Sequence, residues 1–318
     1  MVHILRGNEI EVKPVEWLWK PMIPFGDVTI VQGDGGDGKT TMMLKIAAML
    51  SRGEVPPSIE DGYLIEQSNI EPLSTFFLTS ENKAGSVVVP KSENEGGDSS
   101  MLMFNDETNG HMMLTKEELS EAIEQTVARL IIIDPLQAFL PSGVNLGNIA
   151  KMREIFTMLT NVAEANNCAI VIIGHLNKNE HSKAIHRGLG SVDIAAAARS
   201  ILLVEADKRN EMIRYVRNIK CNYDGAEHAR ILLHLDENHR LSFREAVSEE
   251  RRTQIDKATV LLYELLQNGA VPVSEAKERC SLEGISSKTA QRAKQQIGAI
   301  QKYIGRTAVW ELPTDSVV

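Results

Sequence analysis

A glycine-rich segment between an apolar run and a helical pattern constrains this sequence most. Gly33-Asp34-Gly35-Gly36-Asp37-Gly38-Lys39-Thr40 fits the pattern G-x-x-x-x-G-K-[ST], with the apolar run Val28–Gln32 before it and the helical pattern Thr40–Leu50 after it. Glycines let backbone N–H groups turn inward around phosphates, and the start of the helix adds partial positive charge. The sequence therefore predicts a loop that binds a nucleotide through its phosphates.

The loop's own side chains have expected roles. Lys39 is expected to reach the β- and γ-phosphates of ATP, and the Thr40 hydroxyl is expected to bind Mg²⁺. The residues of this segment that we expect to contact the nucleotide are Gly33, Asp34, Gly35, Gly36, Asp37, Gly38, Lys39, Thr40 and Thr41.

Continuous apolar runs indicate the fold class. They are typical of central strands in a parallel sheet that is covered on both faces, and they lie at Val28–Gln32, Thr75–Thr79, Leu130–Ile133 and Ala169–Ile173. Helical patterns separate them, at Thr40–Leu50, Lys116–Val127 and Ile149–Ala165. Further strands, some of them in antiparallel hairpins, are predicted at Ser200–Glu205, Met212–Arg217 and Ala229–His234. Strands that alternate with helices predict an α/β domain with a mostly parallel sheet.

Two stretches lack a regular period. Ala84–Asp106 is interpreted as a mobile surface loop, and Asp236–Asp256 as a polar segment that separates the α/β body from a tail. In the tail, helices are predicted at Lys257–Leu266, Val273–Cys280 and Ser286–Ile297, with two short strands around Gly305. This order is typical of a winged helix. We expect an α/β domain at 1–248, with a strand or hairpin segment at 1–26, and a small winged-helix domain at 249–318.

Charge is distributed unevenly along the 318 residues, whose net charge is −9. Residues 251–318 carry ten Lys and Arg against seven Asp and Glu, or +3, which leaves −12 on the first 250. A basic end on an acidic body indicates a possible nucleic-acid partner. No apolar run could cross a bilayer, the start lacks a secretory pattern, and the three cysteines suggest neither a disulfide framework nor a zinc site. We expect a cytoplasmic protein with no membrane partner.

Acidic side chains at strand ends are candidates for binding metal and moving protons. Asp134 ends the run Leu130–Ile133, where P-loop enzymes hold Mg²⁺, although such an Asp can also simply cap a turn. Pro135 follows it rather than Glu, so the carboxylate that activates water must come from elsewhere. Glu81, after Thr75–Thr79, is the candidate base, and a solvated loop glutamate is the alternative.

His175 follows the run Ala169–Ile173 and joins the residues expected to contact the nucleotide, as a sensor of the γ-phosphate. A histidine there that is merely hydrogen-bonded is the alternative. The loop beyond it carries Lys178, Lys183 and Arg187, which are candidates to bind DNA phosphates. A solvated surface loop is the alternative for these three residues.

Several motifs keep the order and spacing of a known class of ATPases. They include Trp17-Leu18-Trp19, Ser80-Glu81, Asp134-Pro135-Leu136-Gln137-Ala138-Phe139, Gly174-His175, Arg187-Gly188-Leu189-Gly190-Ser191 and Ala198-Arg199-Ser200. From Val15 to Phe243 the sequence resembles the RecA/DnaB class of P-loop ATPases, and within it the RepA-type hexameric helicases of phages, plasmids and integrated elements. The resemblance implies a RecA-like domain, ATP and Mg²⁺ as cofactors, Glu81 as catalytic base and His175 as sensor.

The same resemblance implies a homo-oligomer, expected to be a hexameric ring around single-stranded DNA, with sites shared between subunits. Arg199 matches the arginine finger of RepA-type proteins, and Lys220 matches the lysine of the DnaB-type Lys-x-Arg pair. Asn222 replaces the second member of that pair, which departs from the DnaB pattern. The segment after Glu81 departs too, because it is poorly helical where relatives carry an amphipathic helix.

The tail resembles the winged-helix module that accompanies such ATPases, on the residues Gly284-Ile285-Ser286, Thr289, Arg292-Ala293-Lys294 and Trp310-Glu311-Leu312-Pro313. Ser286 is the expected N-cap of the third helix. On or near one face of that helix, the residues expected to contact duplex DNA are Lys288, Gln291, Arg292 and Gln295. A winged helix used only for protein contacts is the alternative.

Together these features predict a Mg²⁺-dependent ATP hydrolase acting on DNA, a helicase or helicase-like motor that serves the replication or maintenance of a mobile element. Its catalytic residues would be Lys39, Glu81 and either Arg199 or Lys220. Two alternatives remain open. One is a RecA-like ATPase that is not a helicase, such as a loader or recombination accessory. The other is a DNA-binding regulator gated by nucleotide.

Overall fold

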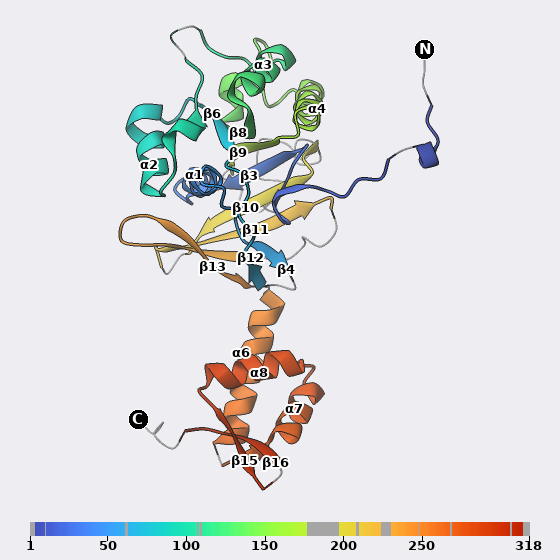
Figure 1. Cartoon of the computed structure of the whole chain (residues 1–318), viewed down its shortest axis with the longest axis vertical. Coiled ribbons are helices and arrows are strands. Elements are labelled where there is room, and N and C mark those ends of the chain that lie inside the picture. The colour runs from blue at the N-terminus through green and yellow to red at the C-terminus, as the bar shows by residue number, and fades with distance from the viewer. Residues whose placement is uncertain are drawn as a thin grey trace. The chain divides into compact units, whose positions relative to one another are not determined.

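The structure is a computed structural model that describes residues 4–9, 11–60, 63–106, 108, 110–176, 197–207, 210–223, 230–247, 249–267, 269–305 and 307–313 (Figure 1). The chain divides into two compact units, Met1–Ala246 and Val247–Val318. No helix in the described ranges is long and apolar enough to span a membrane.

A large mixed sheet forms the middle of the first unit. Among the described residues it has nine strands, in the order β13-β12-β11-β10-β3-β9-β8-β6-β7. Their bounds are β3 Val28–Gly33, β6 Ser74–Thr79, β7 Leu102–Met103, β8 Ala128–Asp134, β9 Ala169–His175, β10 Ser200–Ala206, β11 Ile213–Cys221, β12 Arg230–Leu235 and β13 Leu241–Val247. Every pairing from β10 across to β7 is parallel, whereas β10–β11 and β11–β12 are antiparallel. The predicted α/β class with a mostly parallel sheet is confirmed.

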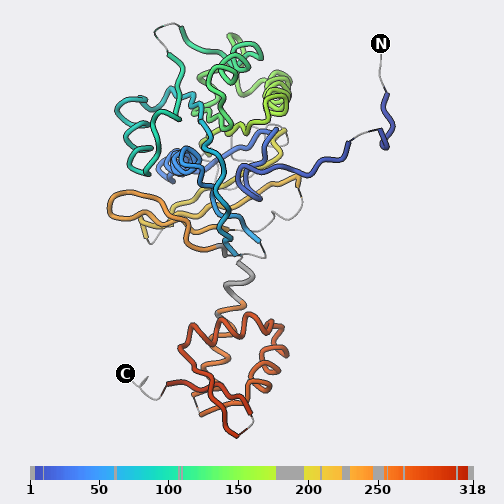
Figure 2. Tube along the Cα trace, in the orientation of Figure 1, coloured from blue at the N-terminus to red at the C-terminus, as the bar shows by residue number. Residues whose placement is uncertain are grey.

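Strands far apart in the sequence lie side by side in this sheet, since β3 pairs with both β9 and β10 (Figure 2). Neighbouring residues along β3 face opposite layers, because side chains alternate along a strand. Ile30 packs in a cluster with α3 (Lys116–Thr126) and α4 (Ile149–Ala165), whereas Val31 packs with α1 (Lys39–Leu50). Helices therefore cover both faces, which explains why the central strands are apolar throughout.

Small hairpins complete this unit, with β1 (Trp17–Trp19) paired to β2 (Ile23–Pro24) and β4 (Ser58–Glu60) paired to β5 (Tyr63–Ile65). Trp19 is fully buried in the layer of α1, and its indole N–H donates to the Pro57 carbonyl at 3.0 Å. Trp17 packs edge-on against Tyr223, with ring centroids 5.6 Å apart. Both tryptophans thus have protein partners. Short 3₁₀ turns lie at Gly7–Glu9, Ser99–Met101 and Leu136–Phe139.

The predictions of a loop over Ala84–Asp106 and of a poorly helical segment after Glu81 are wrong for Ala84–Asn94, which is helical, whereas the rest of the range has only short elements. A single π-helical turn covers Ala84–Val88 and continues directly into α2 (Val89–Asn94). Buried Glu95 anchors the segment, because its carboxylate accepts a hydrogen bond from Leu241 N at 2.7 Å and lies 3.2 Å from the Lys45 ammonium. Contacts with distant parts of the chain therefore order a segment whose own residues favour a loop.

The prediction for Asp236–Asp256 also needs correction. Leu241–Val247 forms strand β13 beside β12, and α6 begins at Glu249 rather than at Lys257. The boundary between the two units, at Ala246/Val247, does fall within this stretch, but the stretch is not irregular, because it contains an edge strand and the first turns of a long helix. Leu241 is buried in the first unit's core. The sequence shows no sign of a strand here, because the neighbours of Leu241 along the chain are mostly polar.

The second unit consists, in its described residues, of one long helix, two shorter helices and a small sheet. Its elements are α6 Glu249–Leu266, β14 Val271–Pro272, α7 Val273–Leu282, α8 Ser287–Gln296, β15 Ile300–Ile304 and β16 Thr307–Glu311. The strands pair antiparallel in the order β14-β16-β15. Trp310 is fully buried in the core, where α8 contributes only the small side chains Ala290 and Ala293.

Candidate nucleotide-binding site

The glycine-rich loop joins β3 to α1 at the carboxyl edge of the parallel strands. Gly36 and Gly38 have φ values of +87° and +90°, which residues other than glycine rarely adopt. Gly33 is required for another reason, because a Cβ there would lie 2.3 Å from the Val204 carbonyl oxygen of β10. The loop thus folds as the sequence pattern predicts, with its backbone packed tightly against the neighbouring strand.

Lys39 lies inside this loop and is 5% exposed. Its ammonium donates to the carbonyls of Gly33 at 2.9 Å and Asp34 at 2.8 Å. Burial lowers the pKa of Lys39, while the nearby carboxylates of Asp37 and Asp134 oppose that effect. The loop therefore encloses a cation where the pattern expects the terminal phosphates of a nucleotide.

Asp37 supports the loop from within. One carboxylate oxygen accepts a hydrogen bond from Asp34 N at 2.6 Å, and the other accepts from Ala206 N, at the end of β10, at 3.2 Å. The sequence suggested Asp37 only as a nucleotide contact. Its side chain instead ties the loop to an adjacent strand, and the distance of Ala206 along the chain explains why the pattern did not reveal this contact.

Thr40 and Asp134 meet beside the loop. The Thr40 hydroxyl donates to the Asp134 carboxylate at 2.9 Å, and Asp134 is 1% exposed. Burial raises the pKa of Asp134, and the hydrogen bond from Thr40 opposes that shift. In the described part of the chain, no group of three or more His, Cys, Asp or Glu side chains could hold a metal. One hydroxyl and one carboxylate fit Mg²⁺, which typically takes one or two carboxylates together with the phosphates of its substrate.

His175 bridges Lys39 and Glu81. Its Nδ1 lies 3.4 Å from the Lys39 ammonium, and its Nε2 lies 3.5 Å from a Glu81 carboxylate oxygen. This follows from strand register, because His175 pairs with Gly33 across β9 and β3. The side chains of His175 and Glu81 are both nearly half exposed. The structure therefore brings Lys39 of the loop together with two residues that the sequence placed at separate strand ends.

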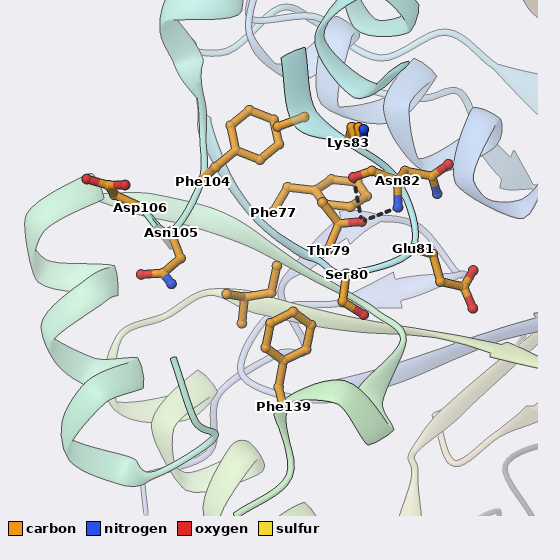
Figure 3. Close-up of a pocket in the computed structure, with 12 residues that line it drawn as sticks. Phe77, Thr79, Ser80, Glu81, Asn82, Lys83, Phe104, Asn105, Asp106 and Phe139 are labelled. Carbon is orange, nitrogen blue, oxygen red and sulfur yellow. Dashed lines mark hydrogen bonds between the residues drawn. The ribbon is translucent and has the colours of Figure 1, made fainter. Parts of the chain in front are cut away.

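Glu81 borders an open cavity of about 540 Å³ (Figure 3). Phe104, Asn105 and Asp106 lie at the far end of this cavity from Glu81, and the Phe139 ring lies on another side. The backbone leading to Glu81 is held by Thr79, whose hydroxyl accepts a hydrogen bond from Asn82 N at 3.2 Å. The Glu81 carboxylate is thus accessible to water while its attachment to β6 is fixed.

A second cavity, of about 250 Å³, is lined by Gly36, Gly38 and Thr41 of the loop and the helix after it. Lys91 of α2 and Arg214 of β11 line it too, and neither was predicted from the sequence. Arg214 donates to the carbonyls of Glu211 at 2.6 Å and Ile213 at 3.0 Å. This cavity therefore borders the loop beside Thr41.

Arg199 and Lys220 lie near the amino end of β3, at the end of the sheet opposite the loop, which we call the far edge. Arg199 directly precedes β10, whose first residue Ser200 pairs with Thr29 near the start of β3, and Lys220 pairs with Ile201. With a rise of about 3.3 Å per residue, the length of β3 separates this edge from the loop by about 17 Å. The structure therefore does not bring these two cations to the loop of the same chain.

The residues expected to contact DNA fall into two groups. Lys178, Lys183 and Arg187 lie outside the described residues. On α8, Lys288 and Gln295 are exposed, whereas Gln291 and Arg292 are half-buried. Ser286 accepts a hydrogen bond from Thr289 N at 3.1 Å, so its prediction as the N-cap of this helix is confirmed.

Comparison with known proteins finds a family model, described as an AAA domain, that matches residues 4–181. The chain is similar to the DNA repair protein RadA of Streptococcus pneumoniae, with 25% identity over 48% of this chain and 31% of that protein. It is similar to RadA of Mycobacterium tuberculosis, with 25% identity over 64% of this chain and 36% of the relative. For RadA of Campylobacter jejuni the identity is 23%, over 65% and 40%. The chain thus spans only about a third of the length of these relatives.

Proposed function

Because this chain belongs to the AAA domain family of P-loop ATPases, we propose that it hydrolyses ATP with Mg²⁺ and acts on DNA as a helicase or helicase-like motor. One observation carries the ATP-hydrolysing part of the proposal. Lys39, Thr40, Asp134, His175 and Glu81 converge at one edge of the sheet, around a loop shaped to hold phosphates.

In this proposal Thr40 and Asp134 hold the metal ion, which when bound neutralises charge on the phosphates. Lys39 binds the terminal phosphates and stabilises the charge that develops as the bond to the γ-phosphate breaks. Glu81 orients a water molecule from the adjoining cavity and takes its proton. His175 contacts both Lys39 and Glu81, so it can respond to the γ-phosphate and affect the base.

The far edge supports an assembly of several copies. Arg199 and Lys220 lie too far from their own subunit's loop to touch its nucleotide, so as catalytic cations they must act on a neighbour's. A cation supplied in trans typically raises phosphoryl-transfer rates by several orders of magnitude. We therefore infer a homo-oligomer, expected to be a hexameric ring, with Arg199 the preferred finger and Lys220 the alternative.

We assign DNA binding to the tail, residues 249–318, as a winged helix. The order of helix, strand, two helices and a final hairpin supports this assignment. The exposed face of α8 bears Lys288 and Gln295 and no acidic side chain, which favours a polyanionic partner. In a ring, single-stranded DNA would occupy the centre and duplex DNA would bind the tail. We also propose that the protein acts in the replication or maintenance of a mobile element.

A second candidate has an observation in its favour. The relatives reported above are named DNA repair proteins, which favours a RecA-like ATPase that acts on DNA without separating strands. Strand separation on a forked duplex distinguishes the two. ATP-dependent release of a labelled strand supports the helicase. DNA-stimulated hydrolysis without strand release supports the second candidate.

Steady-state ATP turnover, with and without single-stranded DNA, tests the proposed site. Lys39→Ala should abolish turnover and weaken nucleotide binding. Glu81→Gln should retain binding but lose turnover by at least about 100-fold, because it removes only the base. Glu66→Gln, at an exposed position away from the loop, is the matched control and should behave as wild type. Undiminished turnover in Glu81→Gln would remove that residue from its assigned role.

A further inference from the structure

A buried carboxylate lies among the cations at the far edge of the sheet. We propose that Asp27 is a positioning residue, which holds Arg199 in place so that its guanidinium enters the nucleotide site of a second copy of this chain. The inference rests on the proposed function and adds a residue that neither the motifs nor the family match indicates.

Asp27 directly precedes β3 and is 5% exposed. One of its carboxylate oxygens accepts a hydrogen bond from Val28 N at 2.9 Å, and the other accepts from the Tyr223 hydroxyl at 2.6 Å. The second oxygen also lies 4.0 Å from Arg199 Nε. Burying a carboxylate costs free energy unless charge and hydrogen bonds compensate it. The two hydrogen bonds thus fix the orientation of the Asp27 carboxylate, and its buried negative charge attracts the Arg199 guanidinium.

Lys220 holds the backbone beside Arg199. Its ammonium donates to the Ala198 carbonyl at 2.6 Å. Burial lowers the pKa of Lys220, Arg199 lowers it further, and Asp27 opposes both. Two cations close together repel each other, and Asp27 is the carboxylate that offsets this repulsion. The position of Arg199 therefore depends on Asp27 for its side chain and on Lys220 for the peptide before it.

The contact with Asp27 leaves part of Arg199 available to an incoming group. It uses Nε and does not involve the two terminal nitrogens, which together can bind two oxygens of one phosphate. The Arg199 side chain is 55% exposed. It lines an open groove of about 400 Å³ that is shared with Arg153, Phe156 and Asn161 of α4. A second molecule can therefore reach the guanidinium without disturbing the contact with Asp27.

Tyr223 keeps the carboxylate oriented. Its ring is held edge-on by Trp17. Burial and the hydrogen bond to Asp27 both raise the pKa of Tyr223, so the hydroxyl remains a donor. The contacts that run from Trp17 through Tyr223 to Asp27 are of the kind that orients metal ligands or catalytic groups in many enzymes.

Mixing variants of the full-length chain tests this inference. Lys39→Ala removes the phosphate site but keeps the far edge, whereas Arg199→Ala does the reverse. In mixed assemblies of these two inactive variants, some interfaces pair an intact loop with an intact Arg199, so ATP turnover should reappear. Asp27→Asn, which keeps the size of the side chain, should lower kcat about 10- to 100-fold with a smaller change in KM, as expected for a misplaced group.

Mixed with Lys39→Ala, Asp27→Asn should regain turnover, and mixed with Arg199→Ala it should not. Two results would overturn this inference without affecting the proposed function. One is that Asp27→Asn fails to complement Lys39→Ala. The other is that Asp27→Asn has the wild-type kcat while Lys39→Ala is inactive. Wild-type turnover in Lys39→Ala would overturn the proposed function with it. Tyr223→Phe provides a milder second variant, and it should fall in the same complementation class as Asp27→Asn.

Discussion

Replacing Gly33 by alanine tests how closely the nucleotide loop is packed against β10. The added Cβ would lie 2.3 Å from the Val204 carbonyl oxygen and 3.0 Å from an Asp37 carboxylate oxygen. Ordinary carbon–oxygen contacts between strands are about 3.3 Å, so β3 and β10 would have to separate by about 1 Å. The φ of Gly33 is not in the left-handed region, so strain from backbone conformation does not add to this effect.

Overpacking of this kind costs about 1–3 kcal/mol. In a unit of this size that corresponds to a fall in Tm of about 2 to 12 °C. Calorimetry gives the Tm, and ATP titration gives the affinity, which should fall as the Asp37 carboxylate is displaced from Asp34 N. Gly35→Ala is the matched control, because a Cβ there meets nothing within 4 Å. Its Tm should stay the same or rise slightly, since alanine restricts the unfolded chain.

The result that refutes this reasoning is specific. A Gly33→Ala protein whose Tm lies within about 1 °C of wild type would mean that β3 and β10 accommodate the methyl group without cost. Equal destabilisation by both substitutions would attribute the effect to the loop sequence in general rather than to the close contact with Val204.

Other perturbations have equally direct readouts. Asp134→Asn should reduce the Mg²⁺-dependent part of ATP affinity at least about tenfold, so calorimetric titrations with Mg²⁺ and with EDTA should converge in this variant. Glu95→Ala breaks the buried ion pair with Lys45 and should cost about 3–5 kcal/mol in denaturant unfolding; an unchanged midpoint would contradict the anchoring of α2. Cys221 is partly exposed, whereas Cys168 is buried and burial raises its pKa to about 12, so alkylation should modify Cys221 first and Cys168 only on unfolding. Mass spectrometry of the native protein decides this order.

The sequence predicts the nucleotide loop well because everything needed is local. A strand, glycines at fixed offsets and a helix with Lys39 at its start are consecutive, and such a pattern leaves few conformations. The central strands were equally predictable, since residues buried on both faces are apolar without alternation. The positions of Glu81 and His175 near the loop then follow from the shared edge of parallel strands.

Contacts between distant residues were not predictable in this way. Ala84–Asn94 contains Gly85, which disfavours helix, and Pro90, which a helix accepts only in its first turn, where it lies in α2; buried Val88 and the contact of Glu95 with Lys45 order the segment. Local propensity is a weak term that tertiary contacts override. Asp27 gave no signal at all, because its partner Tyr223 lies 196 residues further along the chain.

Strand β10 connects two places that the sequence treats separately. At its end, Ala206 N is bonded to Asp37 inside the nucleotide loop, and just before its start stands Arg199. Because β10 is paired along one side with β3 and along the other with β11, it cannot slide along its axis without breaking backbone hydrogen bonds on both sides. The offset between the nucleotide loop and the backbone at Arg199 is therefore fixed, so in the proposed assembly each chain would present Arg199 to its neighbour at a constant height relative to its own loop.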